Sequence, residues 1–126
     1  MRDAEDRVLL RRRPAQGLFG GMTELPGTPW RETPWKHKEA LAEAPVTAAW
    51  RLAGEIRHGL THFELRLAVY AAELAMVQAK GTLCALADLA DQALPTVMRR
   101  CVSLGLAALI PVAQPPGEPP GLLDAE

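Results

Sequence analysis

The chain has 126 residues, 48% of them hydrophobic and 23% charged, and a formal net charge of −1. This is an ordinary composition for one globular domain with a modest core. The near-neutral charge excludes a global field that would attract nucleic acid. No apolar run approaches the roughly 18 residues that span a bilayer, so no membrane segment is predicted. The opening M-R-D-A-E-D-R lacks a hydrophobic region, so no secretory signal is expected.

The distribution of charge and the positions of the cysteines indicate where a polyanion would bind and whether the thiols are reduced. Residues 1–70 carry 11 Lys and Arg against 9 Asp and Glu, whereas residues 71–126 carry 3 against 6. A polyanion is therefore expected to contact the first half of the chain. Cys84 and Cys101 lie within apolar patterns, which favours reduced core residues of a cytosolic protein over a disulfide or a metal site.

The first predicted element is a strand over residues 7–13. Residues 3–6 form a polar turn, and apolar and basic side chains then alternate. The strand ends in Arg11, Arg12 and Arg13, the densest positive charge in the chain. Two interpretations stay open for these arginines: a solvated strand end, or contacts to phosphate that position a protein on nucleic acid without reading its sequence.

A loop and a short helix follow. Residues 14–27 include Gly17, Gly20 and Gly21, which permit positive φ, and they end in a Pro-Gly turn. The glycine spacing matches neither a Walker loop nor a dinucleotide fingerprint, so a generic loop is predicted. Residues 28–34 read as irregular. Residues 35–44 favour a helix that Pro45 ends, with His37 facing solvent.

Residues 55–72 organise the rest of the chain. Phe63, Leu65, Leu67 and Val69 alternate with polar or small residues, which predicts a strand with one buried face. The preceding residues 57–62 hold two of the three histidines, a glycine and a hydroxyl. They can be interpreted as a polar turn before a core strand, or as recognition chemistry at the mouth of a rigid strand.

The last third of the chain predicts small elements and one long helix. Residues 82–85 suit a short strand, residues 85–92 a helical turn, and Pro95 opens a helix. Apolar residues share one face of that helix at positions Leu94, Val97, Met98, Cys101, Val102 and Gly105. The Pro- and Gly-rich tail is predicted to be mobile or disordered, which divides the chain into a domain over 1–110 and a tail over 111–126.

Two strings carry a resemblance to known proteins. Residues 8–27, V-L-L-R-R-R-P-A-Q-G-L-F-G-G-M-T-E-L-P-G, look like the opening of a Nudix-type fold. Residues 58–70, H-G-L-T-H-F-E-L-R-L-A-V-Y, followed by A-L-P-T-V-M-R-R at 93–100, resemble the C-terminal domain of MutY-family adenine DNA glycosylases. The similarity covers roughly residues 7–106. It implies a Nudix-like α+β fold, with a mixed or antiparallel sheet flanked by helices. The family's first strand, which precedes the turn at residues 3–6, is expected to be lacking.

The same resemblance implies a function in base excision repair. The expected partner is double-stranded DNA with an 8-oxoguanine:adenine mispair, acted on in the bacterial cytoplasm at the nucleoid. Catalysis would belong to an N-terminal domain of the same parent chain, which would carry a [4Fe-4S] cluster. Two cysteines cannot supply a four-thiolate cluster site. This chain is therefore expected to hold no cofactor, no metal and no catalytic residue of its own.

Residue by residue, the resemblance points to the triplet Leu60, Thr61 and His62, which matches the family's Phe-Ser-His. A hydroxyl at Thr61 can donate to one edge atom of 8-oxoguanine and accept from another. Leu60 keeps an apolar wedge but lacks the aromatic face available for stacking. Arg57 and His58 lie close enough in sequence to meet phosphate, as do the arginines at 11–13.

Two other functions stay open from the sequence. An active Nudix pyrophosphohydrolase needs the signature G-x5-E-x7-R-E-U-x-E-E-x-G-U, whose glutamates bind Mg²⁺. Anchored on Gly27, these glutamates would fall at Thr33, Ala42, Pro45 and Val46, so none is present. The third possibility is a protein-interaction module that reuses the same sheet.

Overall fold

The structure, a computed structural model, describes residues 1–109, so the predicted tail over 111–126 lies outside the described residues. Two antiparallel sheets and their helices make up the fold, which confirms the predicted α+β class. The strands are β1 (Arg7–Arg12), β2 (Thr23–Glu24), β3 (Arg51–Gly59), β4 (Glu64–Ala71) and β5 (Thr82–Ala85). The helices are α1 (His37–Ala42), the 3₁₀-helix η1 (Leu86–Asp91) and α2 (Thr96–Leu109).

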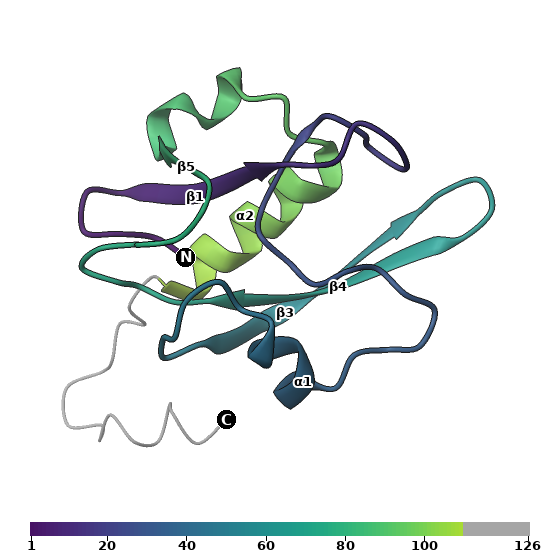
Figure 1. Ribbon diagram of the computed structural model, residues 1–126, viewed down its shortest axis with the longest axis horizontal. Coiled ribbons are helices and arrows are strands. Elements are labelled where there is room, and N and C mark those ends of the chain that lie inside the picture. Colours follow the sequence, from purple (N-terminus) through teal and green to yellow (C-terminus); the bar gives the residue numbers. More distant parts are fainter. Residues whose placement is uncertain (110–126) are drawn as a thin grey trace, which may run out of the picture.

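Helix α2 lies between the two sheets (Figure 1). One sheet has the order β2-β1-β5, and the other is the long hairpin of β3 and β4. Val97 of α2 is fully buried and packs in one cluster with Val8 of β1 and Cys84 of β5. Ile56 and Leu67 of the hairpin pack against the same cluster. The predicted apolar stripe of the last helix is thus confirmed, and burying each such side chain contributes about 1.5–3 kcal/mol.

The three-stranded sheet is organised around β1. Val8 pairs with Cys84 of β5, and Arg11 pairs with Glu24 of β2. The strands predicted over 7–13 and 82–85 are therefore present, as is the helical turn predicted over 85–92. Strand β2 was not predicted, because two residues are too short for alternation to register.

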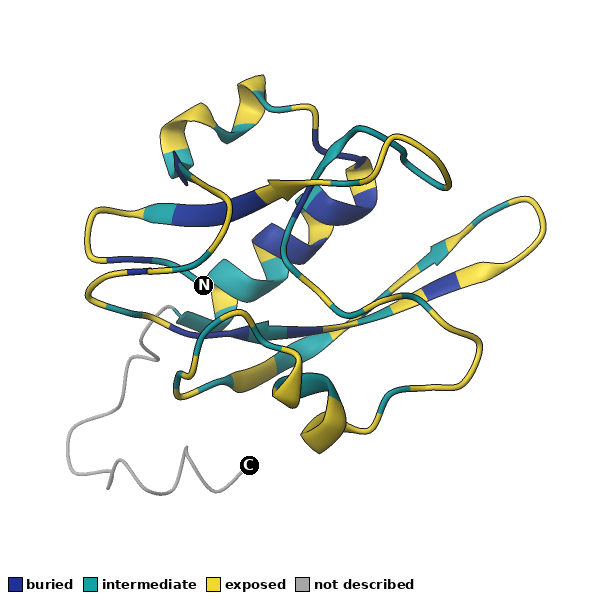
Figure 2. Cartoon of the chain, viewed as in Figure 1, coloured by how far each residue is buried: buried dark blue, intermediate teal, exposed yellow. Residues whose placement is uncertain are grey.

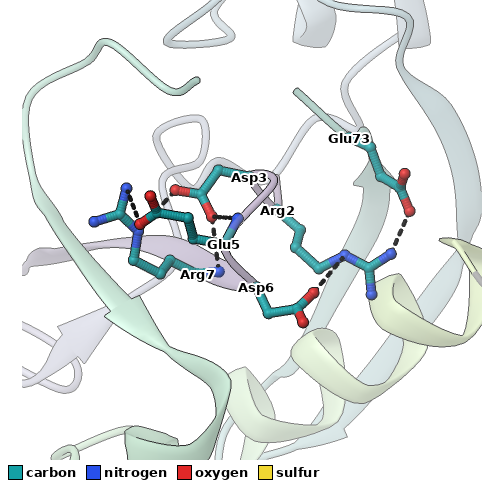
Figure 3. A network of polar contacts seen from close by, with 6 residues as sticks. All are labelled: Arg2, Asp3, Glu5, Asp6, Arg7 and Glu73. Atoms are coloured by element: carbon teal, nitrogen blue, oxygen red, sulfur yellow. Dashed lines mark hydrogen bonds and ion pairs between the residues drawn. The ribbon is translucent and has the colours of Figure 1, made fainter. Parts of the chain in front are cut away.

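Asp3 ties the first turn to β1 through three hydrogen bonds (Figure 3). Its Oδ1 accepts the backbone N–H groups of Glu5 at 3.0 Å and Arg7 at 2.9 Å, and its Oδ2 accepts Nε of Arg7 at 2.8 Å. Burial alone would raise the pKa of Asp3. The donors from Arg7 and Glu5 outweigh burial and hold the pKa below its ordinary value.

Arg2 links the two sheets. It forms isolated bridges with Val8 of β1 and with Glu73, which follows β4. Its backbone N–H donates to the carbonyl of Ala72 at 3.0 Å, and its guanidinium pairs with the Glu73 carboxylate (Figure 3). Arg2 thus pairs both with β1 and with the segment that follows β4.

Helix α1 is shorter than the predicted helix over 35–44. It begins after Lys36, whose backbone N–H donates to the Glu39 carboxylate at 3.0 Å. His37 is exposed as predicted, but its ring also contacts the Tyr70 hydroxyl of β4. This contact lays α1 against the hairpin face that points away from α2 (Figure 1).

Candidate nucleic-acid interface

The turn of the β3–β4 hairpin carries the predicted recognition triplet. The backbone N–H of Leu60 donates to the carbonyl of Phe63 at 2.8 Å, which leaves Thr61 and His62 as the two tip residues. Both tip residues are exposed, and Leu60 is half-buried. Figure 2 shows the turn as an exposed projection from the body of the molecule. The Thr61 hydroxyl therefore lies where a partner can reach it.

Helix α2 contacts the hairpin that carries this turn at two places along β3. Arg100 of α2 donates from Nη1 to the backbone carbonyl of Arg57 at 2.9 Å. A bulge in β3 lies between Leu52 and Gly54, and Gly54 has a φ of +150°, a value that favours glycine. A Cβ at Gly54 would lie 3.1 Å from Leu104 of α2, so strand and helix pack closely here. The tip thus stands on a supported scaffold.

Arg57 and His58 belong to β3, which corrects the prediction of one polar turn over 57–62. The turn proper is only residues 60–63, because cross-strand pairing continues to Gly59 and Glu64. Neighbouring strand residues point to opposite faces. Arg57 therefore lies on the outer face, where Nε donates to Glu55 at 3.0 Å, and His58 lies on the face that α2 covers further along.

The predicted buried face of β4 is only partly buried. Leu65 and Val69 are 7% and 8% exposed, and Leu67 packs against the core. Phe63, expected on the same buried face, is 54% exposed. The turn end of the hairpin extends past the first turn of α2 (Figure 1). No helix within residues 1–109 therefore covers the pair Leu60 and Phe63 at that end.

Glu24 holds two of the three neighbouring arginines. Its carboxylate accepts Nε of Arg11 at 2.7 Å and Nη1 of Arg13 at 2.8 Å. Glu24 is 4% exposed, and Arg13 also lies 4.0 Å from the ring centre of Trp30. Arg12 points away from this pair and donates from Nε to the Gly21 carbonyl at 3.1 Å. The contacts give Arg11 and Arg13 a structural role and leave Arg12 outside it.

An open groove of about 520 Å³ borders this cluster. Its walls include Arg11, Arg13, Glu24 and Trp30, together with Thr28 and Glu43. The sequence patterns did not single out Glu24, because a lone acid in a loop carries no periodic signal. The only local signal was its position in the loop that follows the arginines, shortly before the Pro-Gly turn.

The loop after β1 and the hairpin turn lie at the same end of the long axis of the molecule, where α2 also begins (Figure 1). Arg12 and the tip residues Thr61 and His62 are exposed at that end. The structure thus places basic and hydrogen-bonding side chains from distant parts of the sequence toward one end. Among residues 1–109, no group of three or more His, Cys, Asp and Glu side chains could hold a metal ion.

Two antiparallel sheets around one long helix, with a projecting hairpin, define a Nudix-like domain. A family model described as NUDIX domain matches residues 1–104. The chain therefore belongs to the NUDIX domain family. A comparison with curated proteins gave no match. Within the part of the chain that the structure describes, no helix is long and apolar enough to cross a membrane.

Proposed function

We propose that this chain is the DNA-recognition domain of an adenine DNA glycosylase in base excision repair, reading 8-oxoguanine opposite adenine. The observation that carries the proposal is the exposure of Thr61 and His62 at the tip of a supported hairpin. The resemblance of residues 58–70 and 93–100 to MutY-family domains adds support. Such a domain would act on nucleoid DNA in a bacterial cytoplasm.

Thr61 suits the chemistry of the lesion. Compared with guanine, 8-oxoguanine gains a carbonyl acceptor at position 8, and its N7 becomes a donor. A hydroxyl can donate to the first and accept from the second. The methyl group of Thr61 restricts χ1, so the hydroxyl is held in few orientations before the base arrives.

Bond cleavage would belong to a separate N-terminal domain of the parent chain, which would also hold the [4Fe-4S] cluster. The two cysteines of this chain cannot supply the four thiolates that such a cluster needs. In this proposal the chain contributes recognition, and its partner domain contributes the reaction.

Phosphate contacts would come from Arg12 and Arg57, which are exposed. Arg11 and Arg13 would act indirectly, because Glu24 already holds their guanidinium groups. His58 is half-buried beside the turn and would support it. Contacts of this kind position a protein on a duplex without reading its sequence.

The test measures binding of the 126-residue chain to two duplexes, with 8-oxoguanine or guanine opposite adenine. Thr61→Ala is expected to reduce the preference for the lesion by about 1–2 kcal/mol, the value of one good hydrogen bond. The matched control is Thr47→Ala, which removes an exposed hydroxyl from a loop outside the hairpin. Fluorescence anisotropy at fixed salt gives both affinities.

A lesion preference that Thr61→Ala leaves intact would remove Thr61 from the recognition site. The alternative activity is tested on the same preparation, with nucleoside triphosphates and Mg²⁺ as substrates. Release of pyrophosphate that depends on this chain would favour the pyrophosphohydrolase and count against a recognition domain.

A further inference from the structure

Among the aromatic residues of the described domain, Phe63 is the one that is exposed; Trp50, which also lacks an aromatic or cation–π contact, is half-buried. Phe19 packs edge-on against Trp30, with ring centres 6.3 Å apart, and Arg31 lies 3.6 Å from the ring centre of Trp35. Tyr70 meets His37. Phe63 is 54% exposed, and among residues 1–109 it makes no aromatic or cation–π contact.

A single exposed apolar side chain is common and needs no explanation by itself. The position of Phe63 is the second observation. It directly follows the exposed tip residues Thr61 and His62, and its carbonyl closes the turn with Leu60. Phe63 and Leu60 are therefore cross-strand neighbours, on the face that carries buried Leu65.

The two members of this pair differ in what they can offer a base. Leu60 is half-buried and aliphatic, so it lacks a flat face for stacking. Phe63 is more exposed and has that face. A hydroxyl that reads the edge of a base requires the base to be held in place, and an aromatic ring does this by stacking on it or by wedging beside it.

We propose that Phe63 is the side chain that enters the base stack next to the purine read by Thr61, with Leu60 as its apolar support. The ligand is duplex DNA, and the inference rests on the proposed function. The bound purine would meet the Thr61 hydroxyl at its edge, while the phenyl ring fills the space opened beside it.

The experiment uses the 126-residue chain and duplexes with 8-oxoguanine or guanine opposite adenine. Each duplex carries 2-aminopurine at the 5′ or the 3′ neighbour of that purine, since its fluorescence rises when the stack opens. The variants are Phe63→Ala, Phe63→Leu and Leu60→Ala. Met76→Ala is the matched control, because Met76 is an apolar residue 68% exposed outside the hairpin. Circular dichroism verifies that each variant is folded.

Binding of the wild-type chain to the lesion duplex is expected to raise 2-aminopurine fluorescence at one neighbour. Phe63→Ala should abolish this rise and weaken binding roughly tenfold, the value of one base–aromatic stack. Phe63→Leu should keep part of the fluorescence rise, since leucine can still wedge between bases, but it should bind nearly as weakly as Phe63→Ala, since it lacks the stacking face. Met76→Ala should match the wild type.

The outcomes test two assignments separately: the insertion of Phe63 as a wedge in the base stack, and the recognition of 8-oxoguanine by Thr61. A wild-type chain that prefers the lesion while Phe63→Ala binds like Met76→Ala would overturn the wedge alone. The wedge role of Phe63 would also be overturned if Leu60→Ala abolishes the fluorescence rise and Phe63→Ala retains it. If the wild type binds both duplexes equally and Phe63→Ala loses this binding, the insertion of Phe63 into the base stack is supported and the recognition of 8-oxoguanine is overturned. No binding of either duplex by the wild type would overturn both.

Discussion

Glu24 shows how one buried carboxylate determines what a cluster of arginines does. The run at residues 11–13 looked like the densest free positive charge of the chain, yet Glu24 holds two of its three guanidinium groups. Pairing lets the charges lie beside the core without an isolated buried ion. The phosphate role of Arg12 stays a prediction, and it is now separated from the structural role of its neighbours.

Replacing Glu24 with Gln should lower the free energy of unfolding by about 2 kcal/mol, the range for hydrogen bonds to charged groups. The larger part should come from Arg13, because Arg11 has 43% of its side chain exposed and water screens that pair. Urea unfolding measures the change. Glu64→Gln is the control, since its pair with Arg66 is about half exposed on both sides. Equal losses in the two variants would contradict a special role for Glu24.

Among the elements, the β1–β5 pairing depends on one close approach. Gly81 precedes β5 with a φ of +137°. A Cβ at this position would lie 2.5 Å from the carbonyl oxygen of Leu10 and 2.9 Å from Cδ1 of Leu9. The carbonyl cannot retreat easily, because Leu10 pairs with Thr82 in the sheet.

Gly81→Ala is therefore expected to destabilise the domain by about 2 kcal/mol, from backbone strain and steric overlap together. The control is Gly59→Ala in β3, where an added Cβ meets nothing within 4 Å and φ is not positive. Thermal unfolding at matched pH compares the two variants. A Gly81 variant as stable as the Gly59 variant would show that β5 can shift without cost.

At the scale of the whole molecule, α2 packs against both sheets. Cys84 lies on β5 and Cys101 on α2, and both are buried. Burial raises the pKa of the Cys101 thiol to about 11, and burial also raises the pKa of Cys84. Few thiolates therefore exist near pH 8, and those that do are shielded from reagents.

Both cysteines should resist a thiol reagent at pH 8 and react together once the domain unfolds. Labelling followed by peptide mass spectrometry should show the two sites rising with the same urea dependence, as expected for one cooperative unit. Rapid labelling of Cys84 at urea concentrations that still protect Cys101 would mean that the β2-β1-β5 sheet opens independently of α2.

The sequence by itself determined the elements whose side chains repeat over several turns or strand residues: β1, the inner part of β4 and the buried stripe of α2. Each has a periodic pattern that burial of one face requires. The triplet Leu60, Thr61 and His62 was proposed from a string of adjacent residues, and its recognition role stays a prediction.

Only the tertiary structure decided the exposure of Phe63, the pairing of Glu24 with Arg11 and Arg13, and which of Arg57 and His58 lies on the face that α2 covers. Each depends on where a distant segment lies, such as the first turn of α2 or the second strand of a short pair. Local periodicity carries no information about where a distant segment lies, because these contacts join residues far apart in the chain.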